Sequence, residues 1–446
     1  MRFWRVPSPV AKVWLVASLV ALAAQGASGI GRGAIGESDL SVFYRTCRLL
    51  WEGAGAGVYA ARDAQEGWYR CIPPAGLLWF APFALGSPAL ASLGWGIFNL
   101  GLVALSVWAL LDVLETWPRD QDLARRAAPW AVGALLCLCA PSLQTGQFSV
   151  LFLAAWLLAL RWALREKHEA AVAVLALPAA IKIYPALLLA AFLGPLPLRR
   201  WPRLIGIFAL AFAFWTWVAP LPFYGARTPA LVASFYEHAI FSREGRVSES
   251  LSTGKSSSHG LDTVMLRFLS RDAQPLPGAP PHANCAPTEV LLGANIVRAV
   301  LLALTVMVWL ARGGERDTAR DWIVALALWS ALLFLILPGA KSRYAAYVLP
   351  AFLPLIVHAT LLWRAQSSRR AAYTLFVLVV GALVLSLLPG APRYWGAGLW
   401  GALALWIENG RLLLRAHRRI AEPQTPLVQE PLNEPVALAR RALKKS

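Results

Sequence analysis

Apolar runs of about 20 residues recur along the whole of this chain, and each is long enough for a helix to cross a bilayer core of about 30 Å. The 446 residues are 58% hydrophobic and only 15% charged. A backbone in lipid must satisfy its own hydrogen bonds, so runs of this kind form helices. The sequence therefore predicts an all-α polytopic membrane protein.

The basic residues lie where the positive-inside rule places them. A formal net charge of +18 is also typical of nucleic-acid-binding proteins, but here Arg and Lys cluster in short segments between apolar runs and not on one continuous face. We therefore exclude nucleic acid as a partner. The pattern predicts a multi-pass protein of the cell membrane, in contact with the bilayer, with both termini in the cytoplasm.

The first apolar run resembles a signal peptide in charge and length. We expect it to stay in the protein as a signal-anchor, because the later spans need a cytoplasmic N-terminus to satisfy their charge pattern. The predicted transmembrane domain covers residues 1–410, with outer loops at 29–88 and 222–289, and a basic cytoplasmic tail covers 411–446. Ten full spans are expected, roughly at 10–28, 89–111, 128–143, 148–164, 204–221, 290–311, 321–338, 346–363, 371–389 and 397–410.

Two shorter segments depart from simple spans. The piece at 73–85 is too short to cross and is expected to be re-entrant or interfacial. The piece at 170–192 is expected to form two half-height helices that meet at depth. The second contains Pro178 and the motif KIYP (Lys182–Pro185) and has basic residues on both flanks. Non-helical backbone at membrane depth is tolerated only against a cavity or buried protein.

An amphipathic helix is predicted within the first outer loop. Apolar residues recur there at helical spacing on one face, namely Leu40, Phe43, Cys47, Leu50 and Trp51. The helix should begin near Ser38, end at Gly53 and lie at the membrane interface. Its start carries Glu37 and Asp39. An ionised carboxylate there can accept a proton from an attacking hydroxyl, although acids in a first turn also serve simply to cap a helix.

Cations occur at two further places. Lys182 lies in an otherwise apolar segment, where an ionisable residue usually faces a polar cavity, unless its long stem carries the ammonium to the interface. Lys341 and Arg343 lie in a predicted outer turn beside Tyr344. Paired cations suit the oxygens of a phosphate, and a solvated turn is the alternative.

Several polar residues are weaker candidates for contacts with a substrate. Gln147, in an outer turn, can hydrogen-bond a sugar or merely water. The full set is Glu37, Tyr44, Tyr69, Gln147, Tyr184, Tyr344 and His259. His259 and His282 have no partners at a metal-ligand spacing. The sequence thus indicates no metal site and requires no cofactor, although it leaves a divalent metal open.

Five blocks, in this order, resemble glycosyltransferase family 87, membrane enzymes of the GT-C fold class. They are SDLSVFYRTCRLLWEG with VYA, IPPAGLLWFAPFAL, TGQFSVLFLAAWLLAL, AAIKIYPALLL and KSRYAAYVLPAFLPLI, spread from residue 38 to residue 357. The resemblance implies a bundle of about 10–13 transmembrane or re-entrant helices. It also implies a polyprenyl-phosphate sugar as donor, with mannose the expected hexose.

The resemblance gives the candidate residues their expected roles. Asp39 would be the catalytic base of an inverting transfer on the extracytoplasmic side, and Lys182, Lys341 and Arg343 would bind the carrier phosphate. The acceptor would be a glycan or a glycolipid. Two departures bear on the acceptor: Ile72 replaces an aromatic residue before Pro73–Pro74, and SSSHGLDTVMLRFL (256–269) lacks the family's Asn-Gln start. A transporter or flippase for lipid-linked glycans, or a non-catalytic subunit of an envelope-polymer assembly, is the alternative.

Overall fold

The computed structural model describes residues 8–61, 70, 72–117, 120–241, 260–270, 284–311, 318–337, 340–364 and 396–421, with 374, 377, 380, 381 and 384. Within these residues the secondary structure is helical, apart from an isolated bridge between Ser270 and Cys285 and a bridge residue at Lys341. In this described part of the chain, six helical segments are long and apolar enough to span a membrane. The chain is therefore an all-α, multi-pass membrane protein, as predicted.

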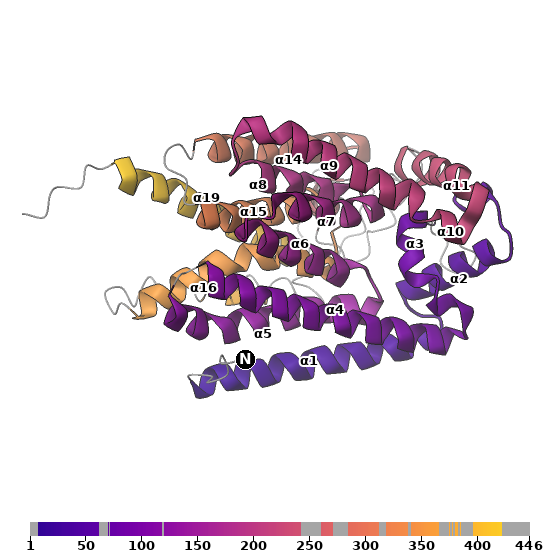
Figure 1. The fold of residues 1–446 in the computed structure, drawn as a ribbon, viewed down its shortest axis with the longest axis horizontal. Coiled ribbons are helices and arrows are strands. Elements are labelled where there is room, and N and C mark those ends of the chain that lie inside the picture. The colour runs from indigo at the N-terminus through magenta and orange to yellow at the C-terminus, as the bar shows by residue number, and fades with distance from the viewer. Residues whose placement is uncertain are drawn as a thin grey trace, which may run out of the picture.

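The long helices run side by side along the longest axis of the molecule (Figure 1). Proline or serine begins most of them: Ser8 caps the first through the Ala11 amide, with Pro9 in its first turn, and Ser87 with Pro88 repeats the arrangement. Their bounds are α1 Pro9–Ala34, α4 Pro88–Thr116, α5 Gln121–Thr145, α6 Ser149–Leu164, α7 His168–Ile181, α9 Trp201–Ala213, α14 Pro287–Leu310, α15 Thr318–Ile336, α16 Leu349–Arg364 and α19 Ala397–Ala421.

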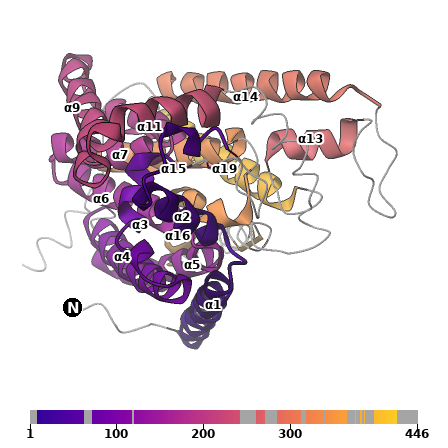
Figure 2. The same ribbon diagram turned by 90° about the vertical axis from the view of Figure 1, so that its right-hand side faces the viewer.

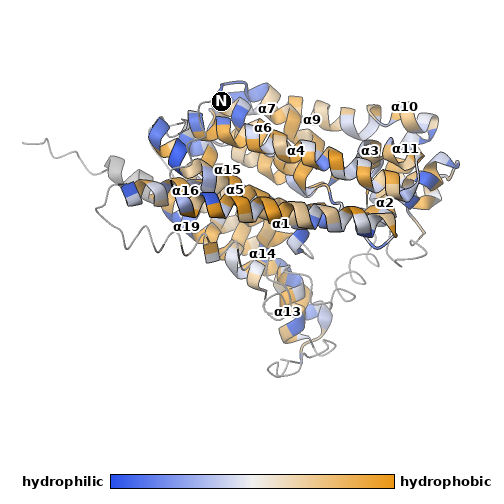
Figure 3. Cartoon of the chain, turned by 90° about the horizontal axis from the view of Figure 1, so that it is seen from below, coloured by the Kyte–Doolittle hydropathy of each residue, from blue (hydrophilic) through white to orange (hydrophobic). Residues whose placement is uncertain are grey.

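Helices α5, α6, α15 and α16 form the core, and α1, α9 and α14 lie at the periphery. Apolar side chains of the peripheral helices, such as Val13, Leu210 and Leu310, remain exposed on the surface. Figure 3 shows apolar colour along the length of the helices. An exposed apolar belt of this extent is suited to lipid and not to water.

Short elements gather at one end of the bundle. These are α2 Asp39–Trp51, α3 Pro74–Phe80, η2 Phe83–Leu85, α10 Leu221–Tyr224 and α11 Thr228–Phe235, with the single turns η1 Ala56–Val58 and η6 Gly225–Arg227. Figure 2 looks onto this end and shows α2 lying across the bundle, in front of α16. At the opposite end basic residues at the end of α6 meet an acidic residue of α4: Arg161 and Arg165 both pair with Asp112.

The predicted break in the 170–192 segment is present. Helix α7 ends at Ile181, Lys182 is extended (φ −145°, ψ 126°), and the chain resumes as η3 Tyr184–Leu188 and α8 Leu189–Leu193. Pro185 contributes because it has no N–H to continue the helical hydrogen bonds. A helix of 14 residues is about 21 Å long, so Lys182 lies at a depth that a full-length span would still be crossing.

Other expected boundaries shift. Trp51 is 43% exposed, against the prediction that it shares the buried face of α2. It follows the buried Leu50 and points about 100° away from it.

The predicted outer loop 222–289 is helical at its start, through α10, α11 and η7 Tyr236–Phe241, and again in α13 Leu261–Leu269. The apolar stretch that leads into it, Leu198–His238, includes the π-helical η5 Phe214–Val218. Helix α19 continues through Ala421, into the predicted tail. The predicted span 371–389 falls mostly outside the described residues.

Candidate active site

The first turn of α2 presents Asp39 to the centre of the bundle end. The helix begins where the sequence predicts, with Ser38 at its N-cap in an extended conformation. The apolar residues Leu40, Phe43 and Cys47 are buried against the bundle. Burial of this face fixes the rotation of the helix, and the rotation turns Asp39 toward the bundle.

The Asp39 carboxylate contacts side chains from two distant parts of the chain. Gln147, in the turn between α5 and α6, donates from Nε2 to Oδ2 of Asp39 at 2.5 Å. Arg343, at the start of η8 Ser342–Val348, forms an ion pair with the same oxygen. The side chains of Asp39 and Arg343 are each only 13% exposed. Asp39 is therefore held by tertiary contacts, and no side-chain bond caps α2 at Ser38.

Arg343 is fixed by its backbone while part of its guanidinium keeps hydrogen-bonding capacity. The Ser149 hydroxyl donates to the Arg343 carbonyl at 2.9 Å. The Nε of Arg343 is buried and has no hydrogen-bond partner among the described residues. A guanidinium can serve several oxygens at once, so one that holds a carboxylate through Nη1 still has donors for a second anion.

Lys182 reaches the same place from the break after α7. Its ammonium lies 3.3 Å from the Tyr344 hydroxyl and 4.6 Å from the centroid of the Tyr344 ring. The Arg343 guanidinium lies 5.4 Å from the same centroid. Tyr344 is therefore flanked by both cations, and it links Lys182 to the Asp39–Arg343 pair.

A stack of aromatic rings supports these cations. Tyr344 stacks on Tyr347 with centroids 5.6 Å apart, and Tyr347 stacks on Phe152 at 5.8 Å. The hydroxyls of Tyr184 and Tyr347 are 2.9 Å apart. Tyr347 is fully buried. Through its contacts with Tyr184 and Tyr344, the stack connects the break after α7 to η8.

Three remaining candidates from the sequence lie at this end of the bundle with contacts of their own. Glu37 is exposed, and its carbonyl accepts a hydrogen bond from Arg32 at 2.9 Å. The Tyr44 hydroxyl donates to the Gly86 carbonyl at 2.9 Å, which anchors α2 to the segment before α4. Lys341 is half-buried two residues before Arg343, and its carbonyl accepts from the Tyr344 amide. Tyr69 and His259 lie outside the described residues.

One further residue at this end became evident only from the structure. Ser149 orients Arg343, and no local sequence signal marks it as more than a helix-start serine. Cys47 lies on the buried face of α2, and burial raises the pKa of its thiol to about 12. Such a thiol stays protonated and does not act as a nucleophile. Within the described parts of the chain, no group of three or more His, Cys, Asp or Glu is placed to hold a metal ion.

The arrangement joins one carboxylate to cations on separate elements at one end of a membrane bundle. Such a site can take a proton at Asp39 and stabilise negative charge at Arg343 and Lys182. A family model described as glycosyltransferase family 87 matches residues 72–338. The matched stretch contains Gln147 and Lys182, while Asp39 and Arg343 lie on either side of it. No curated protein and no solved structure matches the chain.

Proposed function

Because the chain belongs to glycosyltransferase family 87 and is a multi-pass membrane glycosyltransferase, we propose that it transfers a hexose from a polyprenyl-phosphate sugar to a glycan or lipid-linked acceptor. Mannose is the expected hexose. The observation that carries this proposal is the contact of Asp39 with Arg343 beside Lys182. A base next to phosphate-binding cations is what a transfer from a sugar phosphate requires.

The reaction is a single displacement at the anomeric carbon. The acceptor hydroxyl gives its proton to Asp39 as its oxygen forms the new glycosidic bond. The bond from the anomeric carbon to the phosphate oxygen breaks, and the electron pair leaves with the lipid phosphate. Attack opposite to the leaving group inverts the configuration, so one carboxylate is sufficient.

The geometry of Asp39 supports its role as the base. Gln147 and Arg343 both contact Oδ2, so Oδ1 can accept the proton. Gln147 fixes the plane of the carboxylate and thus the direction in which Oδ1 points. General bases of this kind contribute typically 10²–10⁴-fold to a rate.

The cations assist the leaving group. A phosphate needs no general acid, because its leaving charge can be stabilised by fixed donors. Arg343 has an unpartnered Nε, and the Lys182 ammonium lies 3.3 Å from the Tyr344 hydroxyl, beside Arg343 in the chain. Lys341, in the same turn as Arg343, is assigned to the same phosphate.

The membrane orientation follows from the charges. The cell membrane is the proposed location. Among the described residues, Lys12, Arg125, Arg126, Arg161 and Arg165 lie toward the end opposite to α2. By the positive-inside rule this supports the proposal that both termini are cytoplasmic. The Asp39 end would then face outward, where polyprenyl-phosphate sugars present their sugars.

A direct assay tests the function. The purified protein is incubated with a panel of polyprenyl-phosphate sugars and membrane-derived acceptors, and the release of free lipid phosphate is followed. Release with one sugar and not with the others supports the proposal and names the sugar. No release with any donor, from a folded protein, contradicts it. Parallel reactions with a chelator show whether a divalent metal takes part.

A further inference from the structure

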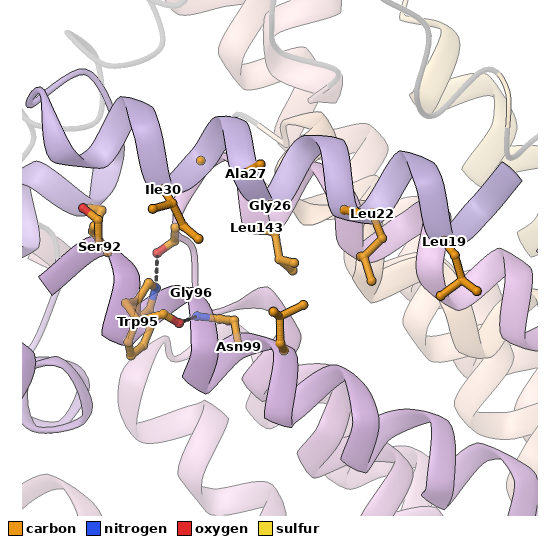
Figure 4. A pocket seen from close by; sticks show the side chains of 15 residues that line it. Leu19, Leu22, Gly26, Ala27, Ile30, Ser92, Trp95, Gly96, Asn99 and Leu143 are labelled. Carbon is orange, nitrogen blue, oxygen red and sulfur yellow. Dashed lines mark hydrogen bonds between the residues drawn. The ribbon is translucent and has the colours of Figure 1, made fainter. Parts of the chain in front are cut away.

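A groove of about 370 Å³ lies between α1, α4 and α5 (Figure 4). Its volume is in the range of sites for small ligands, about 300–1,000 Å³. Small or aliphatic residues of α1 form one wall, and the lining is mostly apolar: Leu19, Leu22, Ala23, Gly26, Ala27, Gly29, Ile30, Leu40, Ser92, Trp95, Gly96, Asn99, Leu100, Leu143 and Gly146.

One part of the groove faces the lipid-exposed surface. Leu19 of α1 and Leu100 of α4, which both line it, are 53% and 45% exposed. Both belong to helices that can span the membrane. A hydrocarbon chain of a lipid in the surrounding bilayer can therefore enter the groove from the side.

Another part of the groove adjoins the candidate active site. Leu40 and Gly146 line it, and they are the chain neighbours of Asp39 and Gln147, which contact each other. This end of the groove therefore lies one residue along the chain from each member of the Asp39–Gln147 contact.

The walls are held by specific contacts. The Trp95 indole donates to the Gly146 carbonyl at 2.9 Å, and the Asn99 amide donates to the Trp95 carbonyl at 2.9 Å (Figure 4). Gly146 has φ +70°, which favours glycine, and Leu40 packs directly on it. The groove is thus largely preformed.

Two buried polar atoms of the lining lack partners. Ser92 and Asn99 are each 2% exposed. The Ser92 hydroxyl and the Asn99 side-chain oxygen have no hydrogen-bond partner among the described residues. Buried polar groups are nearly always paired, so these two atoms point to a bound molecule or ordered water that supplies the missing bonds.

We propose that this groove binds the isoprenoid chain of the donor lipid and thereby guides the sugar phosphate to Asp39. This inference rests on the proposed function. A long, flexible hydrocarbon chain fits an apolar groove with lateral access from the bilayer, and each buried methylene favours binding. A chain seated beside Leu40 brings its polar end toward Asp39, with Ser92 available to hydrogen-bond an oxygen of the ligand.

Filling the groove tests the proposal. Ala23 and Ala27 line it and are exposed on α1, whereas Ala24 and Ser28, one position on, are exposed but do not line it. The variant Ala23→Trp/Ala27→Trp is compared with the control Ala24→Trp/Ser28→Trp. Kinetics are measured with a full-length polyprenyl-phosphate sugar and with a donor cut to one isoprene unit.

The proposal predicts a selective loss. Filling the groove should raise KM for the full-length donor about tenfold or more, with little change for the truncated donor and none for the control variant. Equal effects on both donors, or equal effects of both variants, would overturn the proposal.

A binding measurement separates this result from the proposed function. Wild-type protein is crosslinked with a polyprenyl phosphate that carries a photoreactive group on its chain. The adduct should map to α1 and α4 and disappear with excess unlabelled polyprenyl phosphate but not with phosphatidylglycerol. If phosphatidylglycerol competes equally, the groove holds bilayer lipid and the proposal fails. A specific adduct without sugar transfer would contradict the function while supporting the groove.

Discussion

Asp39 and Arg343 form an ion pair that joins the start of α2 to the start of η8, with both side chains 87% shielded from solvent. Gln147 donates to the same carboxylate oxygen. In this state Arg343 is engaged by the base that we assign to catalysis. A donor phosphate would therefore share the Arg343 guanidinium with Asp39, which holds Nη1, and this sharing makes the roles of the two residues separable by experiment.

Removal of the Asp39 charge should tighten the binding of lipid phosphate. In Asp39→Asn the Arg343 guanidinium loses its anionic partner and becomes fully available to a phosphate. Polyprenyl phosphate should then bind several-fold more tightly than to the wild type, as measured by displacement of a labelled analogue. Arg343→Met should bind it more weakly than the wild type. Unchanged affinity in both variants would show that Arg343 does not contact the phosphate.

Gln147 is expected to act on kcat more than on KM. Gln147→Leu removes the donor that orients the Asp39 carboxylate, while Arg343 still pairs with it, so kcat should fall about tenfold, equivalent to roughly 1.4 kcal/mol of barrier. The control is Gln144→Leu, three residues earlier in the last turn of α5. A fall in kcat for the control as large as that for Gln147→Leu would show a general effect on this turn.

Lys182 is expected to act mainly through donor affinity. Lys182→Met keeps the length of the side chain and removes the charge, so KM for the donor should rise about tenfold. Tyr344→Phe is the matched comparison, because it keeps the ring 4.6 Å from the ammonium and removes only the hydroxyl at 3.3 Å. If KM for the donor rises more in Tyr344→Phe than in Lys182→Met, then the Tyr344 hydroxyl, and not the Lys182 ammonium, contacts the substrate.

The packing of α1 is testable through two glycines. A Cβ at Gly29 would lie 2.3 Å from the Leu143 carbonyl oxygen of α5, whereas a Cβ at Gly31 would meet nothing within 4 Å. Gly29→Ala should therefore destabilise the protein by about 1–3 kcal/mol, and Gly31→Ala should leave stability unchanged or raise it by up to about 1 kcal/mol. Thermal unfolding in detergent measures both. Equal changes in the unfolding temperature of Gly29→Ala and Gly31→Ala would show that α1 does not pack on α5 at Gly29.

Local patterns were enough to predict parts of this end of the bundle. The spacing of Leu40, Phe43 and Cys47 predicted α2 and its buried face, and the acid at its start was visible before the structure was known. Pro178 and Pro185 predicted the break that exposes Lys182. In each case the signal lies within a few residues of the feature that it predicts.

The contacts between distant segments were not predictable in the same way. Nothing near Asp39 indicates that its partners are Gln147 and Arg343, because that pairing depends on how α2, the α5–α6 turn and η8 pack. The groove likewise lies between α1, α4 and the end of α5, where Gly26, Gly96 and Gly146 come close only in the folded chain. Trp51 shows that spacing alone can also mislead. Its spacing fitted the apolar face of α2, yet its side chain points about 100° away from that of the buried Leu50 and remains exposed.

The central claim is that Asp39 is the catalytic base, and turnover of the Asp39→Asn variant tests it most directly. Single-turnover transfer from the preferred polyprenyl-phosphate sugar is compared in wild-type protein and in Asp39→Asn, with thermal unfolding and lipid-phosphate binding as controls on folding. The account predicts a rate that falls about 10²–10⁴-fold in a folded protein that still binds the lipid. A folded variant with the wild-type transfer rate would contradict it.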